Sequence, residues 1–371
     1  MSVHGILLAG AAMTCALAAF PAQAQLPRVL LFLAFLAVQP VLAQLPLESD
    51  YFLEAPDSVK HAVIVVGPSV GEENISQFRQ WGYSLHDILV RDYGYSTDTI
   101  TLLHDPDEAG PNPGNRLDGT SDRAGIEEAF AALLSRISDG DQVTVYLIGH
   151  GSGEGEEAKF NIIGPDMTGA EFREILDRFE RQDMVVINTT SASYGFSTFL
   201  SSEGRVVISA TRSPSEKFDP VFSRYFIEAL DGRAGDLDKN NRVSMLEAFN
   251  YAKANVEQWY EEQGRLASEH AGLDDNGDSL FSLGPGIDDP DGRLAEIAYI
   301  DTAAAETENL SGEALELKTR MQQLERSVFI LRGRKNDYLE QDYWRRMEEL
   351  LVDLARTTAR FNEMTPELMN P

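Results

Sequence analysis

The chain has 371 residues, with 31 Lys or Arg against 60 Asp or Glu, and its formal net charge is −29 at pH 7. That length allows a large buried core, and a hydrophobic fraction of 43% is ordinary for a globular protein. The acidic excess disfavours nucleic acid as a partner, because phosphate binding requires patches of Lys and Arg. It favours solubility and divalent cations.

Residues 1–43 have the features of an export leader. Gly5 to Phe20 is apolar, and Ala22-Gln23-Ala24 is a small-x-small cleavage site. A second apolar run, Val29 to Ala43, follows Arg28, and each run is too short to predict a membrane-spanning helix by itself. We expect an exported protein of the periplasm or cell envelope whose mature form starts near Gln44. The alternative is that the second run is retained as a membrane anchor.

The cysteine content sets the redox expectation. The only cysteine, Cys15, lies in the leader region. The mature protein is therefore expected to contain no disulfide and no thiol nucleophile.

Strands and helices alternate between His61 and Thr211. Each expected strand is a short apolar run, and each expected helix has apolar residues spaced by three and four. The expected strands are 61–67, 99–103, 143–148, 184–188 and 205–211, and the expected helices are 75–93, 123–138 and 168–181. This alternation predicts an α/β fold in which helices flank a parallel sheet. In such sheets the ligand site lies beyond the carboxyl ends of the strands, where His150, Thr190 and Arg212 stand.

Residues 236–247 match the twelve-residue calcium loop of an EF-hand, and helices are expected on both sides, at 220–230 and 245–263. The usual glycine is replaced by Asn241, which tolerates the left-handed conformation better than other non-glycine residues. We therefore expect Ca²⁺ as a cofactor, the alternative being an Asp- and Asn-rich turn without a metal. The expected ligands are the side chains of Asp236, Asp238, Asn240, Ser244 and Glu247 and the backbone carbonyl of Arg242.

A second acidic turn covers residues 274–278. Asp274, Asn276 and Asp278 alternate like the start of a calcium loop, but Pro285 stands at the twelfth place and offers no side-chain ligand. Cation binding at this turn is left open.

The C-terminal region differs in pattern from the rest of the chain. Residues 285–310 are rich in Gly, Asp and Ala and are expected to be a linker. Two apolar stripes in 311–371, separated by a turn within 333–340, predict a helical hairpin of coiled-coil type. The hairpin either packs against the rest of the chain or mediates self-association.

Three segments stand in order at expected strand ends: Gly149-His150-Gly151-Ser152, the run 187–193, and Ser209-Ala210-Thr211-Arg212 with Glu216. Together they resemble the legumain-like (C13) family of the caspase/legumain clan of peptidases, and in particular its exported bacterial members. The resemblance covers about 63–278, within an expected peptidase-like domain at 48–284. It implies a caspase/legumain-like fold.

The resemblance also implies roles for individual residues. In the family a His acts beside a Cys thiolate, and a backbone amide stabilises the oxyanion. By position His150 would be the catalytic His, Gly151 would supply the amide and Thr190 would occupy the nucleophile position. Thr189 and Ser191 are the neighbouring candidates for that position.

The resemblance likewise assigns the wall of the substrate pocket to Arg212 and Glu216. The alternative for these two residues is a surface ion pair.

The hydroxyl at the nucleophile position leaves several functions open. A hydroxyl is much less acidic than a thiol and needs a positioned base, itself oriented by a third group. The expected function is therefore a calcium-binding pseudo-peptidase that binds peptide or protein segments. The alternatives are a hydrolase that uses Thr190 or Ser191 with His150, a purely structural use of the fold, and a calcium-stabilised interaction module that acts through the hairpin.

Overall fold

The computed structural model describes residues 50–54, 58–110, 116–286, 289–302, 310 and 312–365. The expected leader, residues 1–43, lies outside the described residues. Within the described ranges, no helix is both long and apolar enough to cross a bilayer.

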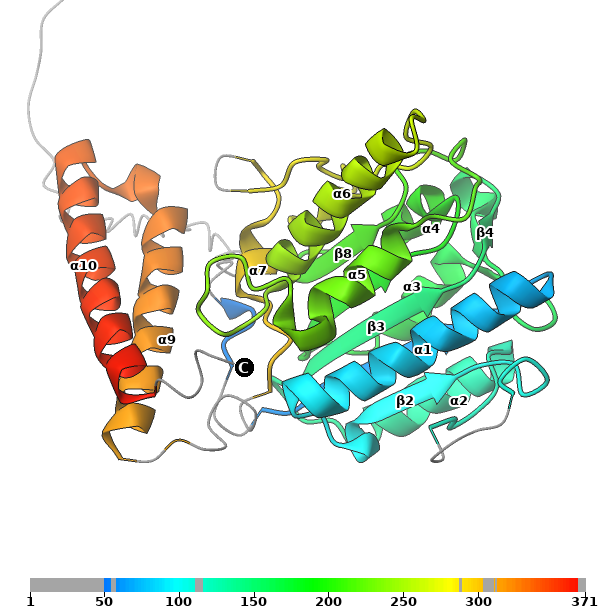
Figure 1. Cartoon of the computed structure of the whole chain (residues 1–371), viewed down its shortest axis with the longest axis horizontal. Coiled ribbons are helices and arrows are strands. Elements are labelled where there is room, and N and C mark those ends of the chain that lie inside the picture. Colours follow the sequence, from blue (N-terminus) through cyan, green and yellow to red (C-terminus); the bar gives the residue numbers. More distant parts are fainter. Residues whose placement is uncertain are drawn as a thin grey trace, which may run out of the picture. The chain divides into compact units, whose positions relative to one another are not determined.

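The central element is a six-stranded sheet in the order β2-β1-β3-β7-β8-β9 (Figure 1). All neighbouring strands from β2 to β8 pair in parallel, and β9 pairs antiparallel with β8. The strands are β1 (Lys60–Val66), β2 (Ile100–Leu103), β3 (Gln142–Ile148), β7 (Asp183–Asn188), β8 (Arg205–Ser209) and β9 (Gly272–Asp274). The predicted α/β class is confirmed, but the sheet is mixed, because a three-residue strand such as β9 has no periodicity that a sequence could reveal.

A small antiparallel sheet follows β3 directly. It consists of β4 (Gly151–Ser152), β5 (Lys159–Phe160) and β6 (Met167–Thr168). Its first strand begins one residue after His150, so it fixes the path of the chain beyond the carboxyl end of β3.

Helices cover both faces of the large sheet (Figure 1). One face packs against α1 (Glu72–Tyr93), α5 (Phe222–Leu230) and α6 (Met245–Glu262). The other face packs against α2 (Arg123–Leu134), α3 (Gly169–Leu176) and α4 (Ser193–Leu200). Short 3₁₀ turns are η2 (Thr97–Thr99), η3 (Gly155–Glu157), η4 (Asp231–Arg233) and η5 (Lys335–Asp337).

Every residue of β1 and β3 is buried, because successive side chains point to opposite and equally covered faces. Ile64 packs into the cluster with α1, α5 and α6, whereas Val65 packs into the cluster with α2, α3 and α4. Burying one such side chain contributes about 1.5–3 kcal/mol. Polar groups that a ligand could reach are therefore expected beyond the strand ends, because polar side chains within β1 and β3, such as His61 and Thr144, are buried.

Several helix ends differ from their predicted places. α1 begins at Glu72 rather than at 75, and α2 ends at Leu134 rather than at 138. α3 begins after a capping box between Thr168 and Glu171 and ends at Leu176, before the predicted end at 181. These ends depend on local hydrogen bonds and not on the apolar spacing that predicts the helix body.

The expected linker contains ordered structure. α7 (Arg293–Ile297) lies within it, and the side chains of Leu294 and Ile300 are buried in the core that covers one face of the sheet. These few apolar residues do not stand out in the Gly- and Asp-rich composition of residues 285–310, but they pack into the core.

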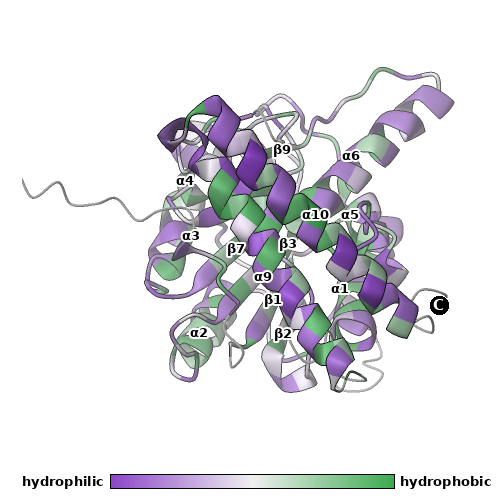
Figure 2. Cartoon of the chain, turned by 90° about the vertical axis from the view of Figure 1, so that its left-hand side faces the viewer, coloured by the Kyte–Doolittle hydropathy of each residue, from purple (hydrophilic) through white to green (hydrophobic). Residues whose placement is uncertain are grey.

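Two long helices, α9 (Glu313–Gly333) and α10 (Glu340–Met364), pack on one another through Met321, Phe361, Leu331 and Met347. Figure 2 shows hydrophobic and hydrophilic residues alternating along α10. Phe329 of α9 belongs to the main hydrophobic core.

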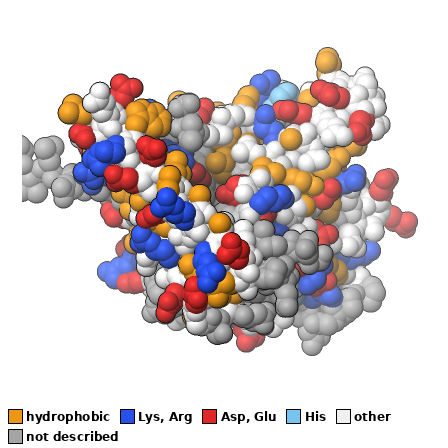
Figure 3. All heavy atoms as spheres, turned by 60° about the vertical axis from the view of Figure 1, so that its left-hand side comes forward, with side chains coloured by type: hydrophobic (Ala, Val, Ile, Leu, Met, Phe, Trp, Pro, Cys, Tyr) orange, Lys and Arg blue, Asp and Glu red, His pale blue; other side chains and the backbone are white. Residues whose placement is uncertain are grey.

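Acidic and basic side chains are interspersed on the face drawn in Figure 3, with hydrophobic side chains between them. The net negative charge is therefore spread over this face together with compensating cations. That distribution does not present the continuous basic patch that phosphate binding requires.

Asp183 at the start of β7 provides a stability test. Burial is the main cause that raises the pKa of its carboxyl from 3.8 to about 6. Protonation of Asp183 thus favours the folded state, a contribution present at acidic pH and lost as the pH rises through about 6. We expect Asp183→Asn to be more stable than the parent at pH 8, by about 1–3 kcal/mol, and equally stable near pH 4. Urea unfolding at the two pH values measures this.

The matched control is Asp139→Asn, because the carboxyl of Asp139 is 68% exposed. Its effect on the free energy of unfolding should be small and independent of pH. A stability difference for Asp183→Asn that does not change between pH 4 and pH 8 contradicts the prediction.

Candidate functional site

His150 lies two residues past the end of β3, and each of its ring nitrogens has a side-chain partner at the carboxyl edge of the sheet. Its Nε2 lies 3.2 Å from Oγ of Ser69, and its Nδ1 lies 2.8 Å from Oδ1 of Asp219. A carboxylate oxygen only accepts, so Nδ1 carries a proton in this arrangement. In the neutral ring Nε2 then accepts the hydroxyl hydrogen of Ser69.

The imidazole is held on further sides. The ring of Phe78 on α1 lies 5.1 Å from it between centroids, and the side chain of His150 keeps 23% of its surface exposed. Asp219 also accepts a hydrogen bond of 3.3 Å from the side chain of Asn74. The ring is therefore oriented by packing and by a carboxylate while one edge stays open to solvent.

Ser69 lies in the turn that joins β1 to α1, within Gly67-Pro68-Ser69-Val70-Gly71. Its backbone amide donates to both carboxylate oxygens of Glu108, at 3.1 and 3.3 Å. Burial is the main cause that raises the pKa of Glu108, while the bond from Ser69 and the nearby His150 act in the opposite direction. The side chain of Ser69 is thus carried by a turn whose backbone is fixed.

The hydroxyls expected at the nucleophile position are engaged elsewhere. Thr190 is 1% exposed, and its hydroxyl donates to Oδ1 of Asn188 at 2.8 Å. Thr189 donates its hydroxyl to the carbonyl of Leu147 at 2.9 Å. Both hydroxyls thus donate their hydrogens to acceptors at the edge of the sheet. The hydroxyl within hydrogen-bond distance of His150 belongs to Ser69.

Gly151 lies against the segment that follows β7. A Cβ added to Gly151 would stand 2.2 Å from the carbonyl oxygen of Ser191 and 2.9 Å from Oγ1 of Thr190. Its amide donates to Oγ of Ser191 at 3.3 Å, and that hydroxyl is 3.4 Å from the Gly151 carbonyl. The close approach explains the glycine after His150, and the expected oxyanion amide is already bonded to Ser191.

Arg212 and Glu216 lie together after β8. The Arg212 amide donates to Glu216 at 3.0 Å, and its guanidinium is 3.7 Å from the carboxylate while 47% of the side chain is exposed. The largely buried Glu216 also contacts Nδ1 of His270 at 2.7 Å. The carboxylate is therefore a structural anchor, and the open part of this pair is the guanidinium.

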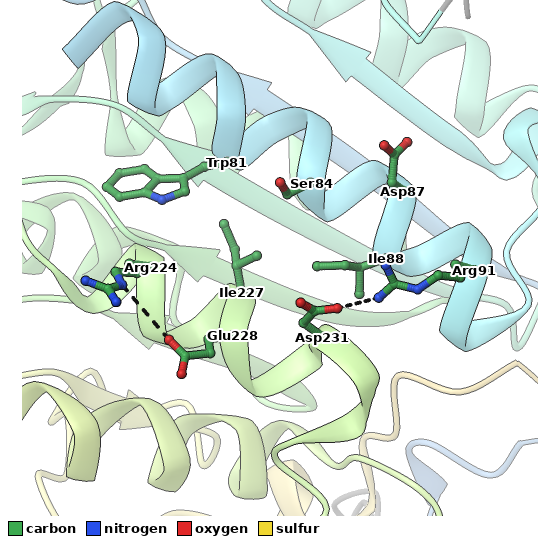
Figure 4. Close-up of a pocket in the computed structure, with 9 residues that line it drawn as sticks. All are labelled: Trp81, Ser84, Asp87, Ile88, Arg91, Arg224, Ile227, Glu228 and Asp231. Carbon is green, nitrogen blue, oxygen red and sulfur yellow. Dashed lines mark hydrogen bonds and ion pairs between the residues drawn. The ribbon is translucent and has the colours of Figure 1, made fainter. Parts of the chain in front are cut away.

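A groove of about 320 Å³ runs between α1 and α5 (Figure 4). Trp81 stands at its wall and stacks on Phe78, whose ring packs on His150. Two ion pairs line the groove, Arg91 with Asp231 and Arg224 with Glu228. The groove thus has charged side chains along it and Trp81 in its lining, and Trp81 is linked to His150 through Phe78.

The carboxylates of Asp236, Asp238 and Glu247 meet, with ligand atoms all within 4.8 Å of one another. Lys239 and Asn241 have φ values of 64° and 65°, the left-handed conformation that was expected at Asn241. This donor set could hold a metal ion. Burial first, and then the charge of Glu247, raise the pKa of Asp238 to about 7, so the carboxylates repel one another in the absence of a cation.

The other expected metal ligands have different partners. The side chain of Asn240 accepts from the amide of Arg242 at 2.8 Å and donates to Asp238 at 3.1 Å. The hydroxyl of Ser244 donates to Glu247 at 2.8 Å in the capping box of α6. These bonds hold the loop in a curved path around the three carboxylates.

The side chain of Arg242, within the loop of residues 236–247, is buried. Its guanidinium lies 2.5 Å from Glu54, 3.8 Å from Glu325 of α9 and 3.4 Å from the ring centroid of Tyr299. Arg242 and Lys60 together hold the pKa of Glu54 at about 2 although burial opposes them. The guanidinium of Arg242 thus links the loop to the core and to α9.

Sequence reasoning missed Ser69 and Asp219. The Gly-x-Ser-x-Gly spacing between the first strand and the first helix was the available signal for Ser69, whereas no motif marks Asp219. No protein-family model matches the sequence, and the search of curated proteins found no match either. What the site can do follows from its geometry.

The close approach at Gly151 predicts a stability effect. Gly151→Ala should lower the free energy of unfolding by about 1–3 kcal/mol, because the new methyl group overlaps the backbone of Ser191. Thermal unfolding with far-ultraviolet circular dichroism measures the loss. Gly284→Ala is the matched control, since a Cβ there has no atom within 4 Å. Equal melting temperatures for the two variants would argue against the described packing.

Proposed function

We propose that the chain is a legumain-like pseudo-peptidase of an exported compartment, whose cleft at the carboxyl edge of the sheet binds peptide segments. The observation that carries this proposal is the state of Thr190, whose hydroxyl is buried and donated to Asn188. A hydroxyl nucleophile needs a base within hydrogen-bond reach and access to the substrate. The engaged hydroxyl of Thr190 therefore supports binding without catalysis at the position where the family has its nucleophile.

The walls of the cleft support an extended polar ligand. Arg212 offers an exposed guanidinium at one side, held through its backbone by the anchored Glu216. On the other side, Phe78 packs on the ring of His150 and Trp81 stacks on Phe78, so an aromatic surface lies beside the His. Such walls suit a peptide that carries polar or acidic side chains.

Peptide binding should depend on Arg212. We expect Arg212→Ala to weaken the binding of a fluorescent acidic peptide to the full chain by about tenfold, because a charge-assisted hydrogen bond contributes about 1.5–3 kcal/mol. Fluorescence anisotropy measures the affinity. Arg181→Ala is the control, because Arg181 is exposed and lies at the opposite edge of the sheet, before β7. Equal affinities for both variants would remove Arg212 from the binding site.

The alternative of a hydrolase that uses Thr190 or Ser191 with His150 has its own test. If the full chain cleaves a peptide pool and Thr190→Ala or Ser191→Ala abolishes cleavage, the pseudo-peptidase proposal fails. If cleavage is absent, the pseudo-peptidase proposal stands. Cleavage that neither substitution affects would place the nucleophile at another residue.

We further propose that residues 236–247 form an EF-hand-like loop that binds Ca²⁺ and stabilises the fold. Oxygen donors from Asp236, Asp238 and Glu247 are the ligand type that Ca²⁺ prefers. A bound cation would offset the mutual repulsion of the carboxylates and would supply no chemistry at the cleft.

Calcium should therefore raise thermal stability. At a Ca²⁺ concentration about 100 times the dissociation constant, the expected stabilisation is about 2.7 kcal/mol. Glu247→Gln should remove most of the rise in melting temperature, whereas Glu262→Gln, an exposed position on the same helix, should keep it. Scanning fluorimetry with Ca²⁺, with Mg²⁺ and with chelator measures the shift. A melting temperature indifferent to Ca²⁺ in the parent ends this proposal.

The rival function, an interaction module acting through a helical hairpin, draws support from exposed apolar residues on α10. Trp344 is 53% exposed and Leu351 is 48% exposed. For this rival we expect concentration-dependent self-association in sedimentation velocity, which a Trp344→Ala, Leu351→Ala double variant reduces. A parent chain that stays monomeric would count against self-association.

A further inference from the structure

We propose that Ser69, His150 and Asp219 form a nucleophilic triad that hydrolyses acyl bonds, esters or amides, of ligands held in this cleft. The inference rests on the proposed function in using the same cleft. It adds catalysis to that binding function, with a nucleophile from the turn after β1, while the position after β7 stays silent.

The three side chains have the mutual geometry of a nucleophile, its base and the group that orients the base. Oγ of Ser69 lies 3.2 Å from Nε2 of His150, and Nδ1 of the same ring lies 2.8 Å from Asp219. Both distances fall within the reach that activates a hydroxyl. The two contacts use opposite nitrogens of one ring, as proton transfer from the hydroxyl through Nε2 requires.

The turn that carries Ser69 suits a nucleophile. It connects a buried strand to a long helix through Gly67-Pro68-Ser69-Val70-Gly71, the strand–turn–helix context in which a Gly-x-Ser-x-Gly spacing has mechanistic meaning. The left-handed residue of the turn is Gly71, with φ 89°. Glu108 fixes the Ser69 backbone from outside and acts as a positioning residue.

The contrast with Thr190 explains why Ser69 is the reactive hydroxyl. Thr190 donates its hydrogen to Asn188 inside the sheet edge, whereas Ser69 meets an acceptor nitrogen that a carboxylate orients. Ser69 and His150 are both partly exposed, so a ligand can reach them, but Thr190 is buried. Reach and activation therefore coincide at Ser69.

The reaction proceeds in two balanced halves. Oγ of Ser69 attacks the carbonyl carbon and its proton passes to Nε2 of His150; the proton then passes to the departing alcohol or amine as the bond to the carbonyl carbon breaks. Water next attacks the resulting serine ester and gives a proton to Nε2. That proton returns to Oγ as the acid leaves, and Asp219 stabilises the imidazolium in both halves.

Negative charge on the carbonyl oxygen would develop close to the first turn of α1. This 22-residue helix begins three residues after Ser69, and no side chain caps its first amides. Free amides and the helix dipole favour an anion there. The amide of Gly151 is already bonded to Ser191. The amides at the start of α1 are therefore the donors that we assign to the carbonyl oxygen.

The test is covalent labelling of the full chain by a fluorophosphonate, which reacts with activated serines, followed by mass spectrometry of the labelled peptide. The expected label is on Ser69, is lost in Ser69→Ala and His150→Ala, and forms at least about 100-fold more slowly in Asp219→Asn. Ser135→Ala, an exposed serine at the end of α2, is the matched control and should label like the parent. A label that depends on Thr190 and not on Ser69 overturns the inference.

Ser69→Cys guards against a variant that fails to fold. Its thiol should react with iodoacetamide at least about tenfold faster than a free cysteine at neutral pH, because His150 favours the thiolate, and the second change His150→Ala should remove the acceleration. A thiol no more reactive than free cysteine overturns the inference. Peptide binding without labelling overturns the inference alone, whereas labelling of Ser69 without peptide binding overturns the proposed function alone.

Discussion

Burial of the parallel strands on both faces is the constraint that decides where chemistry can occur in this chain. β1 and β3 are buried along their whole length, and their side chains alternate between two hydrophobic clusters. A polar reactive group inside such a strand would lose its hydration without gaining partners. Because neighbouring strands from β2 to β8 run in parallel, polar residues beyond their carboxyl ends collect at one edge, and Ser69, His150 and Arg212 follow three of these strands.

Thr190 and Ser69 at that edge differ in how many residues lie between them and the end of their strand. Thr190 is only two residues past the end of β7, and Asn188 at that end captures its hydroxyl. Ser69 is three residues past β1, on a turn that carries it to the imidazole of His150. His150 at the end of β3 can meet hydroxyls from either neighbouring strand, because β1 lies on one side of β3 and β7 on the other.

The parts of the structure that the sequence predicted are those with local signals. The apolar runs located β1, β2, β3, β7 and β8, and the alternating acidic residues located the cluster of Asp236, Asp238 and Glu247, whereas the two-residue strands β4, β5 and β6 were not predicted. The contacts of the proposed triad are long-range: Ser69 is 81 positions from His150, and His150 is 69 positions from Asp219. No local sequence pattern predicts such contacts. The same holds for β9 and for the buried residues of α7, whose short segments gain structure only from the core they join.

Arg242 connects the loop of residues 236–247 to distant parts of the chain. The residue whose carbonyl is an expected ligand also sends its guanidinium to Glu54, before the first strand, and to Glu325 of α9. If the loop binds a cation as proposed, a shift of its backbone would be passed through Arg242 to two segments far apart in the chain. Linkage is reciprocal. If a bound cation changed the affinity of a ligand for α9 by some factor, that ligand would change the cation affinity of the loop by the same factor. Removal of the C-terminal helices is accordingly a perturbation of the metal loop as well as of the surface those helices present.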